Sequence, residues 1–131
     1  MLVGMDERPR TDAQRAGDAA EALVADRLEA AGWTILGRNV HVGRRELDLV
    51  AVDPGPPPTL VIVEVRWRRR RDFGLAEETV DQRKRIRVHE AAYALLERGD
   101  LPHLPLRFDL IVVEPGARGG EPHVRHHRAA L

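Results

Sequence analysis

The order of periodic segments predicts an α/β protein with helices packed on a central mixed sheet. One helical segment comes first, three strand-like segments follow, and a second helix precedes two further strands. The Pro-rich connection at residues 53–59 is too short for a crossover helix, so the strands that it joins should be antiparallel. The second helix separates two buried-type strands, which implies a parallel pair with a right-handed crossover. The 131 residues, 43% of them apolar, suit a single domain.

The first helix is predicted from capping residues and a helical stripe. Residues 1–11 lack periodicity and are expected to form a disordered tail, which leaves residues 12–131 as the domain. Thr11-Asp12-Ala13-Gln14 has the form of a capping box, and Gly32 marks the end of the helix. The packing stripe is formed by Gly17, Ala20, Val24, Leu28 and Ala31. Glu21 also lies in this stripe, and a carboxylate on a packing face needs an explanation.

Alternation, turn residues and capping residues predict the remaining elements. The expected bounds are residues 33–42, 44–53 and 59–68 for three strands, 79–98 for the second helix, and 107–113 and 123–127 for the last two strands. The third strand is partly apolar on both faces, so it should be central in the sheet. A second capping box, Thr79-Val80-Asp81-Gln82, should begin the second helix, and Gly99 should cap its end.

Acidic side chains gather at one end of the predicted hairpin. Period-2 alternation puts Glu46 and Asp48 on one face of the second strand, and Glu64 and Arg66 on one face of the third. Counting back from the turn pairs Asp48 with Glu64 and Glu46 with Arg66. Like charges opposite each other destabilise a sheet, and a bound divalent cation would offset that cost. Oxygen ligands from Asp48, Glu64 and Glu46 suit Mg²⁺ or Mn²⁺ and disfavour zinc.

Each of these residues also has a simpler explanation. The acidic cluster could be a polar strand end closed by Arg pairs. Glu21 could favour the helix dipole rather than join the cluster as an outer member. Arg66 could form an ion pair with Glu46, or it could contact a phosphate, where it stabilises charge but is a poor general base.

The distribution of basic residues indicates a nucleic-acid partner more than the net charge of zero does. An Arg-rich run beside the acidic strands could hold phosphates, although a solvated loop is the alternative. Its members are Arg68, Arg69, Arg70 and Arg71. The chain has no cysteine, which excludes disulfides and thiolate catalysis. No apolar run approaches a membrane span and no signal peptide is visible, so we expect a cytoplasmic protein without membrane association.

Taken together, these residues resemble the bacterial YraN-like family of uncharacterised proteins. The matching positions are Gly17, Glu21, Gly32, Arg38-Asn39, Glu46-Leu47-Asp48-Leu49, Val63-Glu64-Val65-Arg66, Arg68, Phe73-Gly74, Lys84 and Arg107-Phe108-Asp109. That family is similar to archaeal Holliday-junction resolvases and to the restriction-endonuclease-like superfamily. The resemblance implies a restriction-endonuclease-like αβββαβ sandwich. It also implies a catalytic set of Glu21, Asp48, Glu64 and the residue at position 66, with Mg²⁺ or Mn²⁺ as cofactor.

One position departs from the family pattern. Val65-Arg66-Trp67 stands where the family has Val-Lys-Thr, so cleavage could be weakened, or lost with binding retained. Lys84 is the only lysine in the chain and matches a family lysine. It is expected to contact nucleic acid, and it could reach the site from the second helix.

The leading hypothesis is a metal-dependent endonuclease acting on DNA, branched DNA included. A homodimer would favour junction substrates, because such enzymes commonly cut two strands symmetrically. One alternative is a non-catalytic nucleic-acid-binding or DNA-repair accessory module. Another is a protein-interaction domain that uses a free sheet edge.

Overall fold

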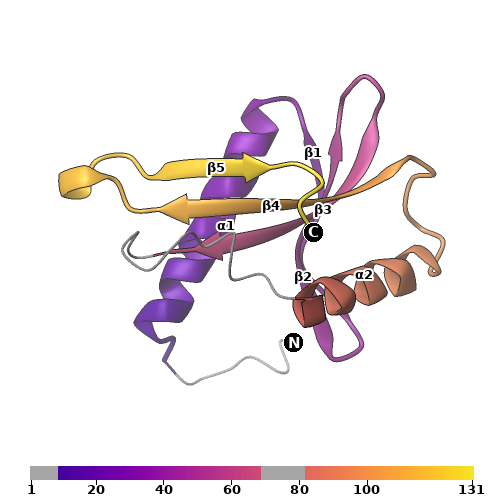
Figure 1. Ribbon diagram of the computed structural model, residues 1–131, viewed down its shortest axis with the longest axis horizontal. Coiled ribbons are helices and arrows are strands. Elements are labelled where there is room, and N and C mark those ends of the chain that lie inside the picture. Colours follow the sequence, from indigo (N-terminus) through magenta and orange to yellow (C-terminus); the bar gives the residue numbers. More distant parts are fainter. Residues whose placement is uncertain (1–8, 69–81) are drawn as a thin grey trace, which may run out of the picture.

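A five-stranded mixed sheet with a helix on each face forms the body of the protein (Figure 1). The computed structural model describes residues 9–68 and 82–131, and the statements below concern those ranges. The elements are α1 (Asp12–Ala30), β1 (Thr34–Val42), β2 (Arg45–Asp53), β3 (Thr59–Trp67), α2 (Gln82–Leu96), β4 (Leu106–Glu114), a 3-10 turn (Ala117–Gly119) and β5 (His123–His127). The strand order is β1-β2-β3-β4-β5, so the predicted mixed α/β class and the central place of β3 are confirmed.

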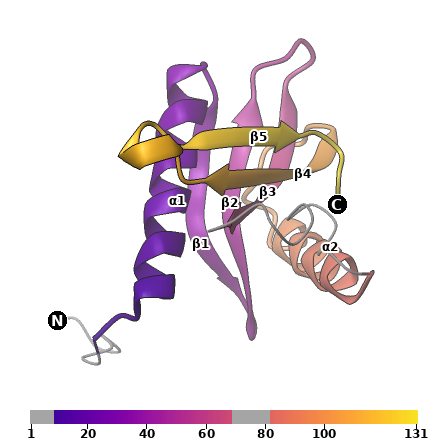
Figure 2. The same cartoon turned by 60° about the vertical axis from the view of Figure 1, so that its left-hand side comes forward.

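Helix α1 begins at the predicted capping box. The Gln14 amide donates to Thr11 Oγ1 at 3.0 Å, and the Thr11 amide donates to Gln14 Oε1 at 2.8 Å. The chain leaves the helix through Gly32, whose φ of +94° is a left-handed conformation that favours glycine. Ala20, Val24 and other buried residues of α1 pack on one face of the sheet (Figure 2). Each buried valine or leucine stabilises this contact by roughly 1.5–3 kcal/mol.

Strands β2 and β3 form the predicted antiparallel hairpin. Val52 pairs with Leu60 and Val50 pairs with Ile62, as the turn length predicted. The paired register ends at Leu49 and Val63. The predicted main-chain pairs of Asp48 with Glu64 and of Glu46 with Arg66 are therefore not formed. Beyond the end of the register, the Val65 amide donates to Asp48 Oδ2 at 2.8 Å, so a side chain serves as its acceptor.

The strict alternation predicted for β2 is wrong next to Asp48. Leu49 packs in the cluster on the α1 face, whereas Leu47 packs with Val50 in the cluster on the α2 face. Residues two apart would share a face in a regular strand. On β1, Arg38 pairs with Leu49 and Val40 pairs with Leu47. Between them, Asn39 has a φ of +49°.

Strands β3 and β4 are parallel and are linked by α2, as the strand–helix–strand order predicted. Buried residues of α2, namely Val88, Ala91, Ala92 and Leu95, cover the sheet face opposite α1. Strand β5 pairs antiparallel with β4, which confirms the predicted short last strand. Three residues of the predicted second capping box, Thr79, Val80 and Asp81, lie outside the described residues.

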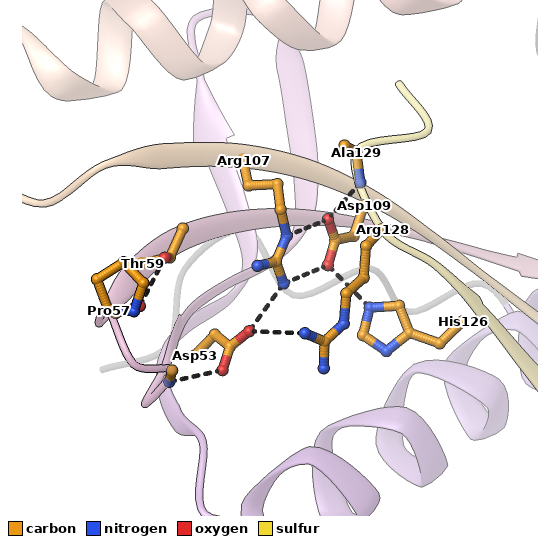
Figure 3. Close-up of polar contacts among 9 residues, drawn as sticks. Asp53, Pro57, Thr59, Arg107, Asp109, His126, Arg128 and Ala129 are labelled. Atoms are coloured by element: carbon orange, nitrogen blue, oxygen red, sulfur yellow. Dashed lines mark hydrogen bonds and ion pairs between the residues drawn. The ribbon is translucent and has the colours of Figure 1, made fainter.

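A charged network ties β4 to the end of β2 and to the C-terminal segment (Figure 3). Asp109 is fully buried and accepts from Arg107 at 2.8 Å, from His126 at 2.8 Å and from the Ala129 amide at 3.0 Å. Arg107 also donates to Asp53 at 2.9 Å. Burial alone would raise the pKa of Asp109, but the hydrogen bonds from His126 and Arg107 outweigh it and lower the pKa to about 2. The Arg107-Phe108-Asp109 motif thus contributes a structural ion network.

Candidate functional site

Three acidic residues from three different elements meet at one end of the hairpin. Asp48 of β2 is hydrogen-bonded to Glu64 of β3 and to Glu21 of α1. The Glu64 side chain is only 9% exposed, so this acidic centre is largely shielded from water. The strand pattern predicted that Asp48 and Glu64 cluster, the family resemblance implied Glu21 as a further member, and the structure brings all three together.

The protonated form of Asp48 is favoured by its surroundings. Burial is the largest cause that raises its pKa, followed by the charge of Glu64, and together they bring the pKa to about 8. The hydrogen bond from the Val65 amide acts in the opposite direction and is outweighed. The pKa of Glu21 is also raised, by burial first and then by the charges of Asp18 and Glu46.

Lys84 reaches the acidic centre from the second helix. Its Nζ lies 2.9 Å from Glu64 Oε1, and its side chain is 38% exposed. The expectation that Lys84 could reach the site from α2 is therefore confirmed. The ammonium is partly open to solvent, while the carboxylate that it contacts is not.

Glu46 lies at the outer side of the acidic centre rather than within it. Its carboxylate is 3.7 Å from His41 Nε2 on β1, and its charge contributes to the raised pKa of Glu21. Glu46 lines two hollows. One, of about 570 Å³, is on the Glu21 side, and the other, of about 170 Å³, is on the Lys84 side. The two hollows therefore share Glu46 in their linings, and each is also lined by one residue that contacts the centre, Glu21 in the first and Lys84 in the second.

The predicted basic residues are only partly placed by the structure. Arg66 is half-buried on β3, where its main chain is in register with Val112 of β4. Arg68 follows the end of β3, and its amide donates to the Val113 carbonyl at 2.9 Å. The predicted phosphate contacts Arg69, Arg70 and Arg71 lie outside the described residues.

The donor chemistry of the centre fits a hard divalent cation. Within residues 9–68 and 82–131, no group of three or more His, Asp or Glu side chains is arranged to hold a metal ion. However, Mg²⁺ is usually held by one or two carboxylates while it keeps several waters. Asp48 and Glu64 supply two neighbouring carboxyls, and burial together with the charge of Glu64 raises the pKa of Asp48. A cation bound by both carboxyls would relieve the repulsion between them.

Asn39 belongs to this centre, and the sequence reasoning gave it no role. Its side chain hydrogen-bonds to Glu21, while its backbone takes the left-handed conformation that asparagine tolerates better than most residues. The available signal was the match of Arg38-Asn39 to the resembling family. Asn39 thus positions Glu21 from β1.

Comparison with known proteins places the chain in a bacterial family. A UPF0102 protein of Symbiobacterium thermophilum is 41% identical over 106 residues, which cover 81% of this chain and 87% of that protein. A UPF0102 protein of Deinococcus radiodurans is 41% identical over 115 residues, which cover 87% of this chain and 90% of that protein.

A solved structure of Pyrococcus furiosus SfsA in complex with Ca²⁺ covers 89% of this chain and 64% of its own, with 15% sequence identity and a TM-score of 0.33. That likeness is too weak to support an inference. Within the described residues, no helix is long and apolar enough to cross a membrane.

The family pattern described as "Uncharacterised protein family UPF0102" matches residues 20–113. This range contains Glu21, Asp48, Glu64 and Lys84, and the match confirms the resemblance drawn from the sequence to YraN-like proteins. The chain therefore belongs to the uncharacterised protein family UPF0102.

Proposed function

We propose that this protein is a metal-dependent endonuclease that cleaves phosphodiester bonds in DNA. The observation that carries the proposal is the buried meeting of Asp48 and Glu64 on adjacent strands, with Glu21 beside them and Lys84 in contact with Glu64. Acids with a raised pKa, such as Asp48 and Glu21, are typical of sites that do chemistry.

The acidic residues of the centre would have different roles. Asp48 and Glu64 would hold Mg²⁺ or Mn²⁺, and Glu21 would fix the orientation of Asp48 from the α1 side. When bound, such an ion lowers the pKa of a coordinated water and neutralises charge on a phosphate. Glu46, on the rim, would repel the DNA backbone unless nearby positive charge offset it. Arg66 and the Arg68–Arg71 run would supply that charge at the end of β3.

The substrate class rests on the family resemblance together with the fold. A mixed sheet with a helix on each face is compatible with a restriction-endonuclease-like sandwich, and the similarity to junction resolvases favours branched DNA. A two-fold dimer would place two such sites on one junction. The preference for branched DNA and the two-fold dimer are both part of the proposal.

A cleavage assay with structured substrates tests the proposal. The purified protein is incubated with Mn²⁺ and with branched, linear and single-stranded DNA of the same sequence, beside an Asp48→Ala variant. We expect the wild type to cut branched DNA fastest and the variant to be inactive. Equal cleavage by both proteins would assign the activity to a contaminant and refute the proposal.

A second candidate, a non-catalytic nucleic-acid-binding or DNA-repair accessory module, is favoured by one observation. Arg66 stands where the family pattern has lysine, and arginine cannot serve as a general base. This candidate would be supported if the protein binds DNA and is stabilised by Mg²⁺ but cleaves none of the three substrates.

A further inference from the structure

We infer that the ammonium of Lys84 on α2 contacts the scissile phosphate and stabilises its negative charge. The family pattern assigns this role to a lysine at position 66. This inference rests on the proposed nuclease function and names a residue for it. Lys84 is the only lysine in the chain, against 20 arginines, so the one ammonium side chain present lies at the acidic centre.

The contact geometry is the first support. Lys84 Nζ is 2.9 Å from Glu64 Oε1, and Glu64 in turn is hydrogen-bonded to Asp48. An ammonium at this position contacts one predicted metal ligand, Glu64, directly and is one contact away from the other, Asp48. A phosphate oxygen shared with a cation on Asp48 and Glu64 would therefore come within reach of the same ammonium.

The access to solvent is the second support. Lys84 lines the hollow of about 170 Å³ together with Arg45, Glu46 and Arg87. Arg45 is paired with Glu90 and also donates to the Arg87 carbonyl at 3.4 Å, which directs it along α2. Among these basic residues, Lys84 is the one that contacts an acid of the centre. A DNA strand lying in this hollow would contact Lys84 next to the acidic centre.

The chemistry of lysine suits this task. Its ammonium has three donors, so it can contact Glu64 and a non-bridging phosphate oxygen at the same time. In the hydrolysis, a water oxygen bonds to phosphorus and the bond from phosphorus to the leaving oxygen breaks. The water gives up a proton to solvent, and the leaving oxygen takes one from solvent. Lys84 exchanges no atom, and it stabilises the negative charge that grows on the phosphate oxygens.

Variants at position 84 test the role by cleavage. Lys84→Met removes the charge and should lower the cleavage rate by about 100-fold, as for loss of one oriented donor. Lys84→Arg keeps the charge on a wider group, so its cleavage rate should lie between those of Lys84→Met and the wild type. Arg85→Met is the matched control, because it removes one charge from the next residue of α2. Arg85 lines different hollows, with Ile86, His89 and Leu131, and its loss should leave the rate close to wild type.

A spectroscopic measurement gives a readout that does not depend on cleavage. Reductive ¹³C-methylation labels the side chain of the single lysine and the N-terminal amine, so the Lys84 NMR signal is read against an internal control. We expect Mg²⁺ to shift the Lys84 signal, and a DNA duplex added with Mg²⁺ to shift it further. In Asp48→Ala the metal-dependent part should disappear.

The outcomes separate this inference from the proposed function. If Lys84→Met cuts like the wild type while Asp48→Ala is inactive, the inference fails and the nuclease function stands. If DNA and Mg²⁺ leave the Lys84 signal unmoved, the inference fails whether or not cleavage is seen. If the wild type neither cuts DNA nor responds to metal, the proposed function fails and the inference fails with it. A shifted Lys84 signal without cleavage supports contact between Lys84 and phosphate.

Discussion

Replacing Asp48 by Asn tests the protonation of the carboxyl pair directly, because asparagine has the shape of a protonated aspartic acid. The Asn Oδ1 can keep the hydrogen bond from the Val65 amide, and the side-chain NH₂ can donate to Glu64. The variant therefore removes the ionisation and keeps the contacts.

The expected effect on stability follows from the pKa of Asp48. Its pKa is raised from 3.8 to about 8 in the folded protein, by burial and then by the charge of Glu64. Between these pH values the folded state holds a proton that the unfolded chain has released, so the free energy of unfolding falls as pH rises through this window. A separation of roughly four pH units corresponds to on the order of 5 kcal/mol. Asp48→Asn has no such ionisation, so its free energy of unfolding should exceed that of the wild type by a few kcal/mol near pH 8.5. Near pH 4 the two values should be equal.

Urea unfolding of both proteins at about pH 4, 6 and 8.5, with a chelator present, measures this difference. Adding Mg²⁺ should stabilise the wild type, by about 2.7 kcal/mol at a hundredfold excess over the Kd, and should leave Asp48→Asn unchanged. Asp26→Asn, which removes an exposed carboxylate from α1, is the matched control. If wild type and Asp48→Asn change in parallel with pH, Asp48 is not the group that holds the proton. An equal response to Mg²⁺ would remove Asp48 from the metal site.

Three further changes have defined outcomes. Asp109→Asn should destabilise the fold by about 3–5 kcal/mol by breaking a buried charged network, measured by urea unfolding. Because the folded-state pKa of Asp109 is about 2, its stabilisation should be complete above about pH 4 and lost as the pH falls through 2. Replacing Arg69 and Arg70, which lie outside the described residues, by Ala should flatten the salt dependence of DNA binding by about 0.9 in log–log slope per phosphate contact; an unchanged slope would make the run a solvated loop. Arg66→Lys should change the cleavage rate by less than about 10-fold if Lys84 already supplies the charge, whereas a larger gain would place the missing lysine at position 66.

Local signals predicted most of the fold, because each one fixes a local choice. The capping box at Thr11 and Gln14 fixed the start of α1, and the length of the connection at residues 53–59 fixed an antiparallel hairpin. A helix between two buried strands fixed the parallel pair of β3 and β4. The network around Asp109 was missed, because its partners come from β4, from β5 and from the C-terminal segment, and no local pattern joins them.

The acids of the candidate site were predictable for a different reason. Glu21 interrupts the packing stripe of a helix, and Glu64 lies on a strand that is otherwise buried. Each is a polar residue placed where burial is costly, so each stands out without knowledge of the fold. The sequence could suggest the pairing of Glu64 with Lys84 but could not establish it, since the pairing depends on how α2 lies against β3.

The error in the predicted register of β2 explains how the site is assembled. Glu64 points to the α2 side, where Lys84 meets it, whereas Glu21 comes from α1 on the opposite face. A side chain on a regular strand reaches one face only. Asp48 contacts both acids because β2 leaves regular pairing there: its ladder with β3 ends at Leu49, and Leu47 turns to the α2 side. Regular alternation continued through Asp48 would have left Glu21 and Glu64 on separate faces, so the break in the strand is what joins them into one centre.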